Sequence, residues 1–123
     1  MDDTATSHDA LVFAMPFLQA IGPKNCERGM MLAVGCWNLS LLPPEHRAAE
    51  EAKILQAFDF AASWFPTSAD GIQDIKKWMK SLIKRKLTKY AHRRRLIVTH
   101  TISFKEGTVT LTTGTVAVPE AEN

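Results

Sequence analysis

Apolar residues near the start of the chain are interrupted by a proline. The stretch ALVFAMPFLQAI spans residues 10–21, and Pro16 within it indicates either a kinked helix or a short helix that begins near the proline. Ser7 stands where an N-cap is expected. Residues 1–7 are small and polar, which predicts a frayed N-terminus.

The next two helical patterns differ in how their apolar residues are distributed. From Cys26 to about Leu42 the chain is apolar on nearly all sides, and such a helix is typically buried; Asn25 can cap it. A second helix is predicted over 45–65, with charged residues in its early turns and apolar residues at a spacing of three and four. We expect this helix to enter from solvent and sink into the core, through Ala48, Ala52, Leu55, Phe58, Ala62 and Phe65.

A basic helix is predicted from Gly71 onward, with Asp70 and Gln73 as a capping-box-like start. One face carries apolar residues, and another groups Lys77, Lys80 and Lys84. Beyond residue 83 this segregation fails, because Lys86 and Lys89 fall within the apolar arc and Arg85 lies near its edge. We therefore expect a helix that begins in the core and ends as a contact surface. Its apolar face comprises Ile72, Ile75, Met79, Leu82, Ile83, Leu87 and Tyr90.

From Leu96 the apolar period changes to two, which predicts a β-hairpin. A two-residue turn at 106–107 sets Lys105 opposite Thr108, Phe104 opposite Val109 and Ile102 opposite Leu111, so that apolar residues meet. The apolar phase slips at Thr113-Gly114, where a β-bulge would bring Val98 to Val116 and Leu96 to Val118. Both edges of such a ribbon remain open to pairing with another chain.

These patterns together predict one α+β domain, in which three to four helices pack against a C-terminal antiparallel β-hairpin. Its 123 residues, 46% of them hydrophobic and 23% charged, are typical of a single globular domain. The predicted parts are a helical part over 8–92, a hairpin over 94–118 and an acidic tail over 119–123.

The formal charge of +2 conceals a division between the two halves of the chain. Residues 1–65 carry eight acids against four bases, whereas residues 66–123 carry five acids against eleven bases. Cys26 and Cys36 are too few and too isolated for a zinc site, and we interpret them as unpaired thiols in a reducing compartment. The acidic start does not resemble a signal peptide, and no apolar run reaches the ~18 residues of a membrane span. We expect a cytoplasmic protein, or a nuclear one if the host is eukaryotic.

Ten Lys or Arg residues and no acid lie between positions 76 and 95, which predicts a surface for an anionic partner. Nucleic acid is the first interpretation, because lysine and arginine neutralise phosphates and release counterions; an acidic protein is the second. Interleaved aromatic rings at Trp78, Tyr90 and His92 would stack on exposed bases. The predicted phosphate contacts are Lys76, Lys77, Lys80, Lys84, Arg85, Lys86, Lys89, Arg93, Arg94 and Arg95.

No catalytic, metal or cofactor motif occurs in the sequence, so we expect a binding module rather than an enzyme. His100 is the weak catalytic candidate, since it interrupts the apolar face of the hairpin opposite Thr113. A general base there would need a concave site with a carboxylate or hydroxyl within reach of the imidazole. The simpler interpretation is a half-buried, hydrogen-bonded histidine.

A second function class is a protein-interaction or assembly subunit. Its interface would be the apolar region 10–42, if that region is not core, or the open hairpin edge, through which the chain would form a homo-oligomer.

Overall fold

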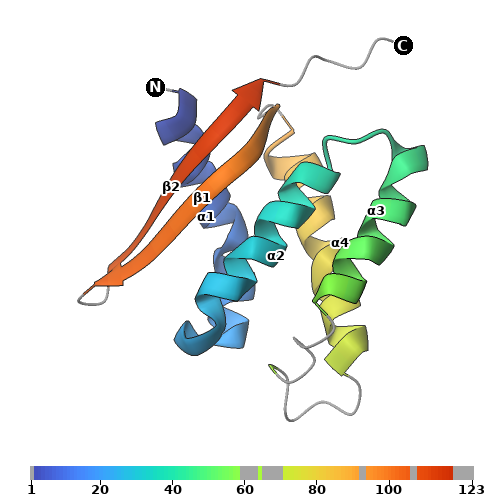
Figure 1. Cartoon of the computed structure of the whole chain (residues 1–123), viewed down its shortest axis with the longest axis horizontal. Helices are drawn as coiled ribbons and strands as arrows, with labels where there is room; N and C mark the ends of the chain where they lie inside the picture. The colour runs from blue at the N-terminus through green and yellow to red at the C-terminus, as the bar shows by residue number, and fades with distance from the viewer. Residues whose placement is uncertain (1, 59–63, 65–70, 92–93, 106–107, 118–123) are drawn as a thin grey trace.

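The computed structural model describes residues 2–58, 64, 71–91, 94–105 and 108–117. Within these residues, four α-helices precede a two-stranded antiparallel sheet, which confirms the predicted α+β class (Figure 1). The elements are α1 (Asp2–Ile21), the 3-10 helix η1 (Pro23–Asn25), α2 (Cys26–Leu39), α3 (Pro44–Ala57), α4 (Gly71–Lys89), β1 (Arg95–Lys105) and β2 (Thr108–Ala117).

The hairpin covers one side of α1 and α2, and α4 packs against the same two helices (Figure 1). The core lies between these layers and is centred on side chains that solvent does not reach, among them Phe13, Phe17 and Trp37. Residues 10–42 supply most of this core, and the large apolar side chains that they expose are Val12 and Met31. In the described part of the chain, this apolar region is therefore core.

Helix α1 starts earlier than the sequence predicts and continues through Pro16. Instead of fraying, residues 2–7 are helical, and the side chains of Thr6 and Ser7 are buried. Ser7 is not an N-cap: its hydroxyl accepts the backbone N–H of Thr113 at 3.0 Å and bonds the Thr113 hydroxyl at 2.7 Å. β2 thus supplies hydrogen-bond partners for the buried Ser7 hydroxyl near the start of α1.

Helix α2 is buried along most of its length, as its composition predicts. It ends at Leu39, three residues before the predicted boundary. Asn25 occupies the N-cap position, but its amide donates back to the Ile21 carbonyl at 2.9 Å rather than to the helix that it precedes.

The prediction for α3 is wrong in its burial. None of its residues is buried: Ala48 and Ala52 are exposed, while Ile54 and Leu55 are half-buried against the core, as is Phe58 just after the helix. Helix α3 lies against α2, on the side of the molecule away from the hairpin (Figure 1). The alanines of the predicted stripe have small side chains and bury little apolar area. Helix α3 therefore packs on the outer surface of α2 rather than within the core. The rest of the predicted stripe and the Asp70 cap fall outside the described residues.

The hairpin has the predicted register near its turn: Lys105 lies opposite Thr108, Phe104 opposite Val109 and Ile102 opposite Leu111. The bulge lies opposite Gly114, but the extra residue is Val98 in β1 rather than a residue of β2. The side chain of Thr99 fills the space over Gly114, where a Cβ would collide with it.

This bulge changes which residues face the helices. Ile97 is buried, whereas Val98 is 55% exposed, so the predicted inward position of Val98 is wrong. Leu96 lies opposite Val116, not Val118. The cause is the attachment of β1 to α2, in which Asn38 fixes the backbone of Ile97 through two hydrogen bonds of 2.9 Å.

Candidate nucleic-acid interface

Helix α4 presents three exposed lysines on the side opposite its buried face. Lys77, Lys80 and Lys84, here called the lysine face, are exposed, while Ile75 and Met79 are fully buried. The spacing of three and four places the three ammonium groups on one stripe along the helix. None of the three forms an ion pair with another described residue. The lysine face thus carries uncompensated positive charge.

Lys86 does not belong to this surface, and its prediction as a phosphate contact is wrong. Nine residues after Lys77, it lies half a turn round the helix, where its side chain is only 2% exposed. Its ammonium donates to the Tyr90 carbonyl at 2.8 Å and lies 4.6 Å from the ring centroid of Trp37. Burial, with a smaller effect from Arg94, lowers the pKa of Lys86 to about 8.

Arg85 is also engaged within the fold. Its guanidinium donates to the Phe13 carbonyl at 3.2 Å and to the Val12 carbonyl at 3.3 Å. The Val12 carbonyl is the one left without an intrahelical donor, because Pro16 has no N–H. Arg85 therefore supplies the hydrogen bond that the proline removes, which accounts for the uninterrupted course of α1.

The remaining predicted basic residues divide into three groups. Arg95 donates to the hydroxyl of Thr115 at 2.6 Å and to its carbonyl at 3.4 Å, so it stabilises the base of the hairpin. Lys76 and Arg94 are half-buried, and Lys89 is exposed on another side of α4. His92 and Arg93 fall outside the described residues.

Two of the aromatic side chains predicted to stack on bases, Trp78 and Tyr90, pack against the core instead. The ring of Trp78 is half-buried, with its centroid 5.4 Å from that of Phe17. Tyr90 lies between Phe13 and Trp37, at centroid distances of 6.1 and 6.0 Å. Arg85 covers the Tyr90 ring at 5.8 Å.

His100 lies half-buried in a hollow of about 380 Å³ between α2 and β1. It is paired with Thr113, as predicted, and the hollow is also lined by Glu27, Met31 and Thr101. A carboxylate and a hydroxyl are thus near, but no hydrogen bond joins the imidazole to another described residue. Burial lowers the pKa of His100, which favours its neutral form in the fold.

We expect acid to destabilise the protein through His100. Because its folded-state pKa is depressed, the unfolded chain binds more protons as the pH falls below the ordinary histidine value of about 6.5. The stability supplied by the neutral imidazole is therefore present above that pH and lost as the pH falls through the folded-state pKa. Urea unfolding should show a smaller decrease in the free energy of unfolding between pH 7 and about 5 for His100→Gln than for the natural protein. An equal decrease in both proteins would contradict a role of His100 in the acid sensitivity.

The two cysteines are free and buried, which agrees with the interpretation as unpaired thiols. Burial raises the pKa of Cys36 to about 12, with Glu51 adding to the shift, and burial also raises the pKa of Cys26. Such thiols are poor nucleophiles. Within the described ranges, no three His, Cys, Asp or Glu side chains are grouped so as to hold a metal ion. No helix in that part of the chain is both long and apolar enough to cross a membrane.

Comparisons with protein-family models, with curated proteins and with solved structures find no match. The site is therefore defined by its own geometry: the three predicted residues Lys77, Lys80 and Lys84 are brought together and exposed. Sequence reasoning missed the structural roles of Arg85 and Lys86. The burial of Lys86 could have been inferred from its position in the apolar arc of the helix. The role of Arg85 could have been inferred from Pro16, which has no N–H and so leaves a carbonyl of the predicted helix in need of another donor.

Proposed function

We propose that the protein is a small non-enzymatic binding module that engages nucleic acid through the lysine face of α4. The observation that carries this proposal is the exposure of three lysines on one stripe of a helix whose other side is anchored in the core, with no ion pair between these lysines and another described residue. A phosphate backbone complements such a stripe, since each lysine that meets a phosphate releases condensed counterions. The protein would act in the cytoplasm, or in the nucleus of a eukaryotic cell.

The test is binding of fluorescent oligonucleotides by anisotropy, with the variant Lys77→Glu, Lys80→Glu, Lys84→Glu. We expect non-specific dissociation constants of roughly 10⁻⁴ to 10⁻⁶ M and a loss of more than about tenfold in the variant, because phosphates would then meet carboxylates. The matched control is Lys24→Glu, Arg28→Glu, Lys53→Glu, which changes the net charge equally at exposed positions away from α4.

The control variant should retain affinity within about threefold, since its charges lie outside the proposed contact. Equal losses in both variants would show that net charge, rather than the lysine face, governs binding. An acidic protein is the alternative partner for the same surface. Polyglutamate that binds more tightly than any oligonucleotide, with the same dependence on the three lysines, would favour that partner.

A second candidate function, self-association, is favoured by the outer edge of β2. The N–H of Thr113 points away from β1, because it donates to Ser7. Backbone groups alternate in direction along a strand, so Val109 and Leu111 also direct their N–H and C=O groups outward. No described residue outside the hairpin bonds these groups.

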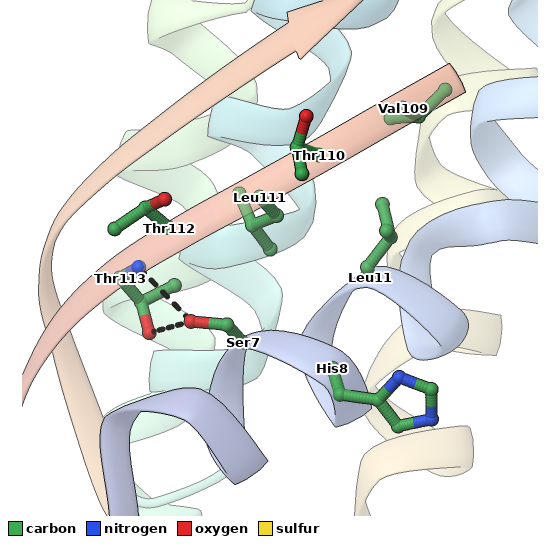
Figure 2. Close-up of a pocket in the computed structure, with 8 residues that line it drawn as sticks. All are labelled: Ser7, His8, Leu11, Val109, Thr110, Leu111, Thr112 and Thr113. Atoms are coloured by element: carbon green, nitrogen blue, oxygen red, sulfur yellow. Dashed lines mark hydrogen bonds between the residues drawn. The ribbon is translucent and has the colours of Figure 1, made fainter. Parts of the chain in front are cut away.

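This stretch of edge borders a groove of about 410 Å³ between β2 and α1 (Figure 2). Figure 2 shows Ser7 and Leu11 of α1 facing the strand. β2 contains no charged residue, so nothing in it repels a second copy of the same strand. Antiparallel pairing of two β2 strands about Thr110 would set Val109 of each copy opposite Leu111 of the other. The outward backbone groups would then satisfy one another.

Thr110→Lys should weaken such a dimer by about tenfold or more, because two ammonium groups would face each other across the symmetry axis. Thr101→Lys is the matched control, since Thr101 is also exposed but lies on β1. Sedimentation velocity over the micromolar to millimolar range measures the dimer dissociation constant of each variant. A natural protein that stays monomeric throughout this range would refute self-association.

A further inference from the structure

We infer that the lysine face binds the phosphate backbone of a double-stranded nucleic acid, without stacking on bases and without reading their sequence. This inference rests on the proposed function and specifies its ligand. It follows from which side chains of α4 are available to a ligand and which the fold has already engaged.

Stacking on single-stranded bases requires an accessible aromatic face. Trp78 packs its ring on Phe17, and Tyr90 has Phe13 and Trp37 around it and Arg85 over its face. The other exposed positions of α4 around the three lysines carry no ring; they are Gln73, Ser81, Leu87 and Thr88. A single strand would therefore meet ammonium groups at the lysine face but no described stacking platform.

Reading bases in the major groove requires a helix that enters the groove. The side of α4 opposite the lysine face is packed against α1 and α2, so that side is closed to a ligand (Figure 1). Arginine is the commonest side chain in specific base contacts, yet the guanidinium of Arg85 is bound to Val12 and Phe13 of α1. The lysines, which act as point charges, are left to contact phosphates.

A duplex offers such point charges the denser target. It carries one phosphate per ~1.7 Å of axis, counting both strands, and releases more counterion per contact than a single strand does. Lys77 and Lys84 lie seven residues apart, a rise of about 10.5 Å along α4. A length of duplex equal to this rise contains several phosphates, so all three lysines can each contact a phosphate at the same time.

The experiment compares single- and double-stranded DNA and RNA of equal length and mixed sequence by fluorescence anisotropy. Duplexes should bind at least about fivefold more tightly than single strands, and two unrelated duplex sequences should bind within about twofold of each other. Three phosphate contacts predict a slope of about −2.7 in log affinity against log salt, which is a loss of roughly 40-fold between 50 and 200 mM. Trp78→Phe should bind duplex and single strand as the natural protein does.

Three results would overturn the inference while leaving the proposed function intact. These are tighter binding to single strands, loss of affinity in Trp78→Phe, and strong preference for one duplex sequence. Absence of binding to all four nucleic acids at low salt would overturn the proposed function and the inference with it. Circular dichroism establishes that each variant is folded, so that a loss of affinity is assigned to the lost contact.

Discussion

Replacing Lys86 with glutamate should destabilise the protein by about 4 kcal/mol or more, whereas Lys84→Glu should change its stability by less than about 0.5 kcal/mol. At position 86 a carboxylate would lie in a buried site beside the Trp37 ring, facing the Tyr90 carbonyl that the ammonium now bonds. Oxygen would then oppose oxygen, and the cation–π contact would be lost. Lys84 is exposed, so the same change of charge there meets water. Urea unfolding measures both variants.

The pH dependence of Lys86 provides an independent control. Its pKa of about 8 in the fold lies below the ordinary lysine value, so the folded protein releases this proton before the unfolded chain does. Stability should therefore rise between pH 8 and about 10.5, relative to Lys86→Met, by up to ~3 kcal/mol. Below pH 8 both states are protonated, and the cost of burying the charge is present in full. A flat difference between the two proteins would contradict a buried ammonium.

Asn38→Ala should cost about 2–4 kcal/mol, because it removes two of the hydrogen bonds that hold β1 on α2 and leaves the one from the Trp37 indole to the Arg95 carbonyl. The Asn38 amide donates to the Ile97 carbonyl and accepts the Ile97 N–H, each at 2.9 Å. Without it, both backbone groups of Ile97 lose their partner beside a buried side chain. Denaturant unfolding, with hydrogen exchange at Ile97, measures the effect.

Asn25→Ala is the matched control for Asn38. Asn25 lies at the other end of the same helix, and its side chain bonds the Ile21 carbonyl alone among the described residues, so its loss should cost about 1 kcal/mol. Equal costs at both positions would show that Asn38 does not attach the hairpin.

Elements with a strong period could be predicted from the sequence, and the attachments between them could not. The buried α2 follows from a local run of apolar residues, and the amphipathic first half of α4 and the register near the hairpin turn follow from a local repeat. The position of the bulge depends on Asn38, which lies 59 residues from Ile97 and has no local signature of that contact. Pattern alone therefore placed the bulge on the wrong strand.

The candidate site shows the same division. Lys77, Lys80 and Lys84 are exposed as the helical projection predicts, because their face opposes a regular apolar one. Charge type alone put Arg85 and Lys86 on the same surface, although the fold uses one to satisfy α1 and buries the other over Trp37. Long basic side chains have enough reach and apolar stem to serve the interior, which charge counting ignores.

The contact between Ser7 and Thr113 has a consequence for how the protein is made. These residues are 106 positions apart, and each buries the other's hydroxyl. Ribosomes add about 5–20 residues per second, so Thr113 is synthesised roughly 5–20 s after Ser7. During synthesis, the polar start and the apolar stretch that follows it have no final partner. Helix α1 can therefore form its contact with β2 only after β2 has left the ribosome, which makes this contact a late step of folding.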